Sequence, residues 1–290
     1  MSEYSEEKST MDKIEVIGKG TLVQHGDLNK RVYLMKLHPD DCPSIITFIN
    51  NLARAYNYTK LFAKIPSWAY PAFQADGYIM EAMIPKFYQG KTDAVFASKF
   101  LNSDRLLDIE TEQLIELHEL LAKNDSKPQK FKLSGKKLKV KELKPDHAEI
   151  LAFLFREVFQ SYPFPIHDSQ FLLDEMKKGT RYFGIFKGKN LVAASSAEID
   201  EKEANAEMTD FAVDPNFRGK KLAIILLQHM EKVLKKKGIH TFYTIARLNS
   251  AAMNKTFFHL KYQYGGTLIM NTNIAGKIES MNVLYKHAGK

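Results

Sequence analysis

The sequence predicts an α/β protein in which helices flank a sheet. Two observations predict this class. Short segments that alternate apolar and polar residues recur from residue 14 to residue 285, as half-buried strands do. Segments with apolar residues at helical spacing separate them, several with a capping residue at the start or a glycine at the end. A length of 290 residues favours two lobes over one.

The composition excludes several classes of protein. Hydrophobic residues make up 44% of the chain and charged residues 26%, a balance that disordered and collagen-like chains do not have. Lys and Arg outnumber Asp and Glu by 42 to 34, which suits an anionic ligand but lacks the clustering typical of nucleic-acid binding. No apolar run reaches the roughly 20 residues of a membrane helix, and the single Cys42 cannot form an internal disulfide. We therefore expect a cytoplasmic protein that binds neither nucleic acid nor membranes.

The first part of the chain predicts a tail followed by an N-terminal lobe. Residues 1–13 are acidic and Ser-rich and are expected to form a disordered tail, whereas residues 14–122 form the lobe. The expected elements of the lobe are a hairpin over 14–37, a helix over 44–56, a strand over 59–65, a helix over 68–76, strands over 78–85 and 94–101, and a helix over 106–121.

A linker and a second domain follow. Residues 123–136 are polar, contain Pro128 and are the expected linker to a domain over residues 137–290. In this domain Pro145 opens one helix, and Asp168 caps another that stops at Gly179. The expected strands cover 138–143, 182–186, 191–199, 206–213, 241–247, 264–270 and 280–285, and the expected helices begin near 145, 169, 222 and 250.

The connection between residue 213 and the following helix carries the clearest signal for a ligand. Asp214 to Lys221 reads DPNFRGKK, directly after a strand and directly before a helix. Such a turn directs several free backbone N–H groups and the positive end of the helix at one point, which predicts a phosphate site. The alternative is a basic connection that binds nothing.

The order of these elements, together with residues 211–215 and 218–223, resembles the GCN5-related N-acetyltransferase (GNAT) family. Arg218 and Ala223 match the family's loop pattern, whereas Lys221 replaces its central glycine, at a cost of roughly 1–2 kcal/mol if that position needs φ > 0. The resemblance implies the GNAT fold, a mixed, mostly antiparallel twisted sheet flanked by helices. It also implies acetyl-CoA as cosubstrate and direct acetyl transfer in a ternary complex without a metal. The cofactor-binding residues that it implies are Phe211, Ala212, Val213, Arg218, Gly219, Lys220, Lys221, Leu222, Ala223, Asn249 and Asn254.

Acetyl transfer to an amine requires a group that accepts its proton. The candidates are Asp210 and Glu207, and because a regular strand would turn them to opposite faces, we expect only one, preferably Asp210, to face the substrate. A tyrosine that many family members use as the general acid is replaced by Phe257. Tyr262, Tyr264 or solvent are left for that role.

Further evidence lies in the closing segment, residues 270–285, together with residues 162–165, 208–212, 244–247 and 253–254. These segments resemble one subgroup, the bacterial and archaeal β-lysine N-acetyltransferases. The resemblance extends over nearly the whole chain and implies L-β-lysine as the acceptor amine and an osmolyte as the product. Carboxylates would hold ammonium groups, while Asn and Arg side chains would take the substrate carboxylate. The implied substrate residues are Tyr162, Phe164, Arg247, Asn271, Asn273 and Glu279, although turn formation explains the Asn-Thr-Asn cluster equally well.

An internal similarity concerns the N-terminal lobe. Residues 59–78 resemble residues 241–262, and both read strand, helix, Phe-x-x-x-Gly/Lys-Tyr, strand. Residues 37–43 stand in the place of the phosphate turn but contain two acids and neither Arg nor Gly. We therefore expect a degenerate GNAT-like lobe that binds no coenzyme A. Two other functions stay open, acetylation of another small amine or a protein amine, and non-catalytic sensing of acyl-CoA.

Overall fold

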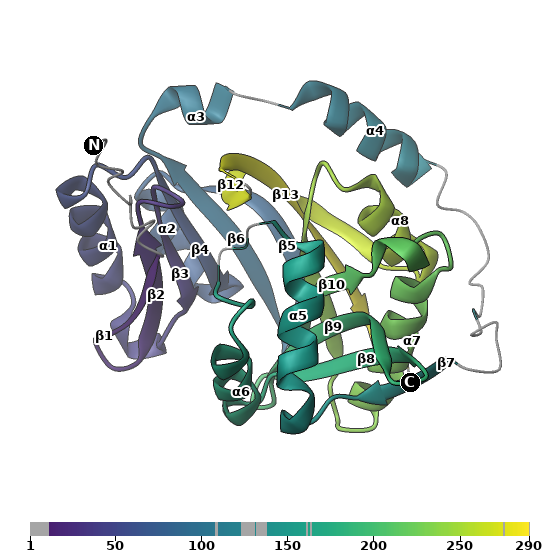
Figure 1. The fold of residues 1–290 in the computed structure, drawn as a ribbon. Helices are drawn as coiled ribbons and strands as arrows, with labels where there is room; N and C mark the ends of the chain where they lie inside the picture. The colour runs from purple at the N-terminus through teal and green to yellow at the C-terminus, as the bar shows by residue number, and fades with distance from the viewer. Residues whose placement is uncertain are drawn as a thin grey trace, which may run out of the picture.

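The computed structural model describes residues 12–107, 110–122, 131, 138–160, 162, 164–274 and 276–289. The strands of these residues form one 13-stranded sheet, in the order β1-β2-β3-β4-β6-β5-β12-β13-β11-β10-β9-β8-β7. Helices flank this sheet (Figure 1). The predicted fold class, a mixed and mostly antiparallel sheet with flanking helices, is confirmed.

We call residues 12–107 the N-terminal half and residues 138–289 the C-terminal half. The N-terminal half contains β1 (Lys13–Ile17), β2 (Thr21–Gly26), β3 (Arg31–Lys36), α1 (Ser44–Ala55), β4 (Lys60–Pro66), α2 (Tyr70–Ala75), β5 (Ile79–Tyr88), β6 (Thr92–Phe100) and α3 (Ser103–Leu107). α4 (Thr111–Ala122) lies between the halves in sequence. The C-terminal half contains β7 (Leu138–Glu142), α5 (Ala148–Val158), α6 (Ser169–Lys178), β8 (Arg181–Lys187), β9 (Asn190–Asp200), β10 (Asn205–Val213), α7 (Leu222–Lys235), β11 (Thr241–Arg247), α8 (Ala251–His259), β12 (Gln263–Ile274) and β13 (Lys277–His287).

The two halves share one topology. The strand order β1-β2-β3-β4-β6-β5 in the first half recurs as β8-β9-β10-β11-β13-β12 in the second. In each half one parallel pair, β3 with β4 or β10 with β11, stands among antiparallel pairs, with a helix between its two strands. This repeat agrees with the internal similarity of the sequence.

The halves meet edge to edge where β5 pairs with β12. Gly266 lies opposite Ala82, and the backbone approaches so closely that a Cβ at Gly266 would lie 2.2 Å from the carbonyl oxygen of Glu81. Beside this pair, the buried Lys60 of β4 donates to the Ile269 carbonyl at 2.6 Å, and the Ile269 amide donates to Glu81 at 2.7 Å. The join is therefore a main-chain contact that polar side chains reinforce.

Apolar packing occurs on both faces of the sheet. α1 packs its apolar stripe, Ile45, Ile46, Ile49 and Ala53, on the N-terminal half, and α7 and α8 pack on the C-terminal half. A third core joins the halves through aromatic residues, with Tyr33 and Phe62 on one side and Tyr243 on the other. α5 and α6 cover a further part of the C-terminal half (Figure 1).

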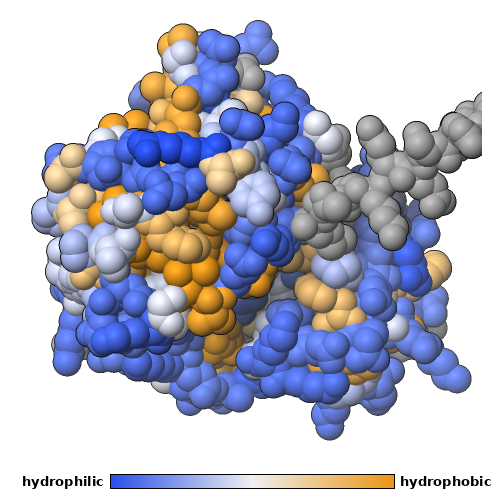
Figure 2. Space-filling model, turned by 90° about the vertical axis from the view of Figure 1, so that its left-hand side faces the viewer, coloured by the Kyte–Doolittle hydropathy of each residue, from blue (hydrophilic) through white to orange (hydrophobic). Residues whose placement is uncertain are grey.

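Seen from the side of the N-terminal half, a band of hydrophobic residues runs between hydrophilic ones on the surface (Figure 2). The edge strand β1 contributes exposed apolar side chains, Ile14 and Val16. No helix within the described ranges is long and apolar enough to cross a membrane.

Several predicted boundaries change. Lys13 belongs to β1, and Asp12 is buried and accepts from Asn29 and Leu28, so the predicted tail is too long by these two residues. The rest of the tail, and the linker apart from Phe131, lie outside the described residues. The helix predicted over 106–121 is two helices, α3 and α4. Figure 1 shows α3 and α4 passing from one half to the other along one edge of the molecule.

Candidate active site

A cavity of about 360 Å³, which we call the inner cavity, lies between the two halves. Its wall on the N-terminal side includes Arg31, Tyr33, Phe62 and Lys64. On the other side it is lined by residues of the α5–α6 segment and of the strands of the C-terminal half: Tyr162, Phe164, Ile166, Phe171, Glu175, Lys178, Thr180, Tyr182, Glu198, Glu207, Thr209, Asp210, Tyr243, Ile245, Asn271, Thr272, Ile274 and Met281. Both halves therefore build one site, on residues far apart in sequence.

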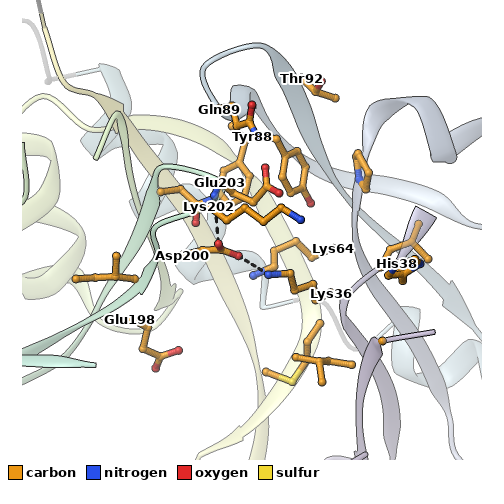
Figure 3. Close-up of a pocket in the computed structure, with 18 of the residues that line it drawn as sticks. Lys36, His38, Lys64, Tyr88, Gln89, Thr92, Glu198, Asp200, Lys202 and Glu203 are labelled. Carbon is orange, nitrogen blue, oxygen red and sulfur yellow. Dashed lines mark hydrogen bonds and ion pairs between the residues drawn. The ribbon is translucent and has the colours of Figure 1, made fainter. Parts of the chain in front are cut away.

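A wider cleft of about 770 Å³ adjoins this cavity, and the two share Lys64, Glu175, Glu198 and Tyr243 among their lining residues. Figure 3 shows Lys36 of β3 reaching across the cleft to Asp200 of β9, at 2.7 Å. The cleft and the cavity are therefore neighbours, and an ion pair between the halves spans the cleft.

Four carboxylates line the inner cavity, Glu175 of α6 and the strand residues Glu198, Glu207 and Asp210, and the last three form a cluster. Glu198 of β9 and Glu207 of β10 stand directly opposite each other in the strand register. Asp210 follows on β10 and is 9% exposed. One of its oxygens accepts from the Ser196 hydroxyl at 2.6 Å, and the other accepts from the Tyr162 hydroxyl. Asp210 is thus held in one orientation by two hydroxyl donors.

A β-bulge corrects the expectation that Glu207 and Asp210 face opposite sides of the sheet. Thr209 pairs with Ser196 and Ala212 with Ala194, so β10 has one more residue than β9 over this stretch. Asp210 takes up the extra residue with φ = +52°. The strand alternation is reset there, and both carboxylates line the same cavity.

Burial and mutual repulsion raise the pKa values of this carboxylate cluster. Removal from water raises the pKa of Asp210, against the opposing effect of its hydroxyl donors. Burial also raises the pKa of Glu207, although Lys64 and the Tyr243 hydroxyl oppose it. The Glu198 side chain is exposed to the cleft, where partial removal from water by the surrounding protein and the charges of Glu207 and Asp210 raise its pKa to about 8. The cluster therefore has a high affinity for protons or for a cation.

Arg31 supplies the opposite charge at another wall of the cavity. It is 5% exposed, and its guanidinium lies over the rings of Tyr33 and Phe62. It donates to the Asn271 carbonyl oxygen and, at 3.2 Å, to the Thr272 hydroxyl. Within the part of the chain that the structure describes, it forms no ion pair with a carboxylate.

Of the six predicted substrate residues, three line the cavity: Tyr162, Phe164 and Asn271. Arg247 and Glu279 do not, because they form a bidentate ion pair with each other at 2.8 and 2.7 Å. Asn273 accepts from the Gly276 amide at 3.1 Å, which is the turn role left open above. Neither Asn273 nor the ion pair belongs to the lining of the cavity.

Tyr262 is also placed away from the cavity. Its side chain is 1% exposed, packs edge-on against Phe257 and lies next to Glu231 of α7, whose charge adds to burial in raising the pKa of the tyrosine. Tyr262 is not among the residues that line the cavity. The hydroxyl that does contact Asp210 belongs to Tyr162.

The basic turn before α7 has the backbone that an anion site requires. Gly219 and Lys221 have φ values of +77° and +59°, and no side chain caps the first turn of α7, so its N–H groups point outward. Arg218, Gly219, Lys220 and Lys221 are exposed, Ala223 is half-buried and Leu222 is buried in the core. Lys221 adopts the left-handed conformation that the glycine of the family pattern would adopt without strain.

A gap in the sheet leads from this turn to the carboxylates. β10 and β11 are paired from Asn205 to Glu207, and the described residues show no register pairs between them beyond that point. Phe211 and Val213 lie along this gap, half-buried, whereas Ala212 is fully buried. The backbone of β10 beyond Glu207 is thus free, on the β11 side, to contact an extended ligand.

Two predicted cofactor residues have partners within the protein. The Asn249 amide donates to Glu110, just before α4, at 2.9 Å. Asn254 is 1% exposed, donates to the carbonyls of Arg247 and Leu248 and accepts from Asn282. Asn254 therefore fixes the turn into α8 and is not available for a ligand.

Sequence reasoning missed Arg31 and Lys64, which only the meeting of the halves brings to the cavity, and Tyr243, which lies beside Glu207 in the strand register. Glu198 carried a weak signal, since Ser196 and Glu198 share one face of β9 beside the strand of Glu207 and Asp210. In the described residues, no three His, Cys, Asp or Glu side chains gather as metal ligands would.

The family model and the curated relatives agree on one family. A model of the acetyltransferase (GNAT) family matches residues 145–257. A β-lysine N(6)-acetyltransferase of Methanococcus maripaludis is 36% identical over 279 residues, which cover 95% of this chain and 99% of that protein. A β-lysine N(6)-acetyltransferase of Methanosarcina mazei is 30% identical over 226 residues, covering 71% and 83%. Among solved structures, the ribosomal-protein-S18-alanine N-acetyltransferase of Escherichia coli is 15% identical with a TM-score of 0.46, covering 53% of this chain and 97% of that one.

Proposed function

Because this chain belongs to the GNAT acetyltransferase family and is an acetyl-CoA-dependent N-acetyltransferase, we propose that it acetylates the side-chain amine of L-β-lysine. The observation that carries this proposal is the cavity wall with Glu198, Glu207 and Asp210, which suits an ammonium group. The product, N-ε-acetyl-β-lysine, has charges that cancel, as a compatible solute requires. A role in osmoadaptation in the cytoplasm follows from that chemistry.

The basic turn and the sheet gap fit acetyl-CoA. The free N–H groups at the start of α7 and the charge of Arg218 and Lys220 suit its pyrophosphate, and the unpaired backbone of β10 suits its pantetheine arm. The acetyl thioester that acetyl-CoA supplies is the electrophile of the reaction. The gap leads to Asp210, so the thioester and the amine would meet at the carboxylates.

The protein must first remove a proton from the amine. A lysine-like amine has a pKa of about 10.4, so only about one molecule in a few thousand is neutral at pH 7. A carboxylate whose own pKa is raised is a better proton acceptor than an ordinary one. Burial raises the pKa of Asp210, and its contacts with Ser196 and Tyr162 hold it in place. We assign Asp210 as the base, with Glu207 and Glu198 holding the ammonium group before the transfer.

Direct transfer in a ternary complex needs no nucleophile from the protein. Cys42 lies just before α1, outside the lining of the cavity, and no serine in the cavity lining is paired with a histidine. The amine nitrogen itself then attacks the thioester. The residues of this chain bind and orient the amine, and Asp210 carries its proton away.

The proposal is tested by measuring the release of coenzyme A from acetyl-CoA with a panel of amines. We expect turnover with β-lysine and at least about tenfold lower kcat/KM with α-lysine, spermidine and a lysine-containing peptide. Preference for another small amine or for the peptide would assign a different acceptor on the same scaffold. Binding of acetyl-CoA without turnover on any amine would identify a sensor and overturn the proposal.

A further inference from the structure

Two polar atoms in the wall of the inner cavity have no hydrogen-bond partner. They are Nε of Arg31, a donor, and Oδ1 of Asn271, an acceptor. Both side chains are more than nine-tenths buried, at 5% and 1% exposure, and both line the cavity. An unpaired buried polar atom destabilises the folded protein, because it has lost its bonds to water, so a ligand that satisfies these two atoms is favoured.

Arg31 also lacks a directly paired carboxylate. Asp12 attracts it electrostatically, but the Asp12 oxygens accept hydrogen bonds from Leu28 and Asn29. The neighbouring cations, Arg105 and Lys60, lie outside the lining, donating to main-chain carbonyls and to Glu81. Arg31 is therefore the cation that this end of the cavity presents, and within the described residues no carboxylate forms an ion pair with it.

The cavity is thus polarised. The guanidinium of Arg31 and the free oxygen of Asn271 lie at the junction of β3 with β12, whereas the carboxylates lie on β9 and β10. A simple diamine would place its second ammonium group next to Arg31, where like charges repel. The ligand that fits has an amine at one end, for the carboxylates, and both a carboxylate and a second amine at the other end, for Arg31 and Asn271.

We propose that Arg31 and Asn271 form a head-group site that binds the carboxylate and the non-reacting ammonium group of a diamino acid. This inference rests on the proposed function and deepens it, since it names the residues that select an amino acid over a polyamine. Arg31 donates from Nε to the substrate carboxylate, and Asn271 accepts from the ammonium group through Oδ1. Both residues are specificity-determining residues and take no part in the transfer itself.

Two analogues of β-lysine separate the two contacts in the wild-type enzyme. 1,4-Diaminopentane lacks only the carboxylate, and 6-aminohexanoate lacks only the second amine. We expect kcat/KM to fall at least about 100-fold for the diamine, because Arg31 is then left unpaired, and at least about tenfold for the amino acid. Equal or higher kcat/KM for 1,4-diaminopentane would overturn the proposal.

Variants identify the residues. Arg31→Met should lower kcat/KM for β-lysine about 100-fold and leave that for 1,4-diaminopentane within about threefold, and Arg31→Lys should restore part of the loss. Asn271→Ala should abolish the preference of β-lysine over 6-aminohexanoate. Arg105→Met is the matched control, a buried arginine bonded to main-chain carbonyls outside the cavity. This control should change kcat/KM for β-lysine and for 1,4-diaminopentane by the same factor.

The outcomes distinguish this inference from the proposed function. If β-lysine is a substrate but Arg31→Met lowers kcat/KM equally for β-lysine and 1,4-diaminopentane, Arg31 only stabilises the contact between β3 and β12. The head-group site is then rejected, and the proposed function stands. If the wild-type enzyme acetylates diamines but not β-lysine, both are rejected. If Arg31→Met fails to fold, kcat/KM of the wild-type enzyme for the two analogues still tests the head-group site.

Discussion

Glu207 and Asp210 line the same cavity, although three residues of a regular strand would turn them to opposite faces. The extra residue of the β10 bulge, taken up at Asp210 with φ = +52°, resets the alternation. A non-glycine residue in this conformation stores backbone strain. Such strain tends to occur at functional sites, where it holds a side chain in the direction that the site requires. The bulge thus brings a third carboxylate beside the Glu198–Glu207 pair.

The assignment of Asp210 as the base predicts the behaviour of Asp210→Asn. The amide keeps the size of the side chain but cannot accept the proton, so kcat should fall about 10²- to 10⁴-fold. The Kd for acetyl-CoA, measured by calorimetry, should change less than twofold. Asp174→Asn, on the exposed side of α6, is the control and should keep full activity. Unchanged turnover in Asp210→Asn would reject the assignment.

Arg218 is predicted to act on acetyl-CoA alone. Replacing it by alanine removes a charge beside the N-terminus of α7, and the Kd for acetyl-CoA should rise about tenfold. KM for the amine should stay unchanged, because Arg218 is not part of the cavity lining. Arg54→Ala, on the exposed side of α1, serves as the charge-matched control. An unaltered Kd in Arg218→Ala would count against the phosphate site.

The raised pKa of Glu198 makes the stability of the ligand-free protein depend on pH. The folded state holds this proton up to about pH 8, whereas the unfolded carboxyl releases it near pH 4.5. The folded state therefore binds more protons within this window, so the free energy of unfolding falls as pH rises through it. Glu198→Gln should remove this part of the decline, which makes the variant increasingly more stable than the wild type between pH 5 and pH 8.

Urea unfolding at several pH values measures the difference in the free energy of unfolding between wild type and variant. The control Glu201→Gln, on the exposed turn after β9, should show no pH-dependent difference. A constant difference across this range would contradict the prediction.

Lys221 is expected to strain the turn before α7. Its φ of +59° costs a non-glycine residue about 1–2 kcal/mol, part of which glycine recovers. Lys221→Gly and Lys221→Ala both lose the contact of the ammonium group with the Phe131 ring, 4.7 Å from its centre. The glycine variant should therefore be about 1 kcal/mol more stable than the alanine variant in urea unfolding. Equal stabilities would mean that the turn relaxes in the variants.

Gly266 should be indispensable to the join between the halves. A Cβ there would meet the main chain of β5, 2.2 Å from the Glu81 oxygen and 2.6 Å from the Ala82 Cα. Gly266→Ala should lower the free energy of unfolding by at least about 3 kcal/mol and lower activity, since both halves line the cavity. Gly188→Ala, also at positive φ but with nothing within 4 Å, should cost only about 1 kcal/mol. Similar losses in both variants would contradict the role of close packing.

The sequence predicted more of the fold than of the site. Strand alternation, helical spacing and caps such as Asp168 are local signals, so they located the elements and, through the turn before α7, the family. The internal similarity of residues 59–78 and 241–262 agrees with the repeated strand order. Arg247 and Glu279, by contrast, have the right chemistry for the substrate but satisfy each other across β11 and β13.

By itself the sequence determined the class of fold, the family and the basic turn, because each depends on residues close together in the chain. The tertiary structure alone decided that Arg31 of β3 faces the carboxylates of β9 and β10 across one cavity, and that Tyr262 stands outside it. That outcome depends on the edge-to-edge pairing of β5 with β12 and on a single-residue bulge. Neither the strand pairing nor the bulge produces a periodic pattern in the sequence, because both depend on packing between segments that are far apart in the chain.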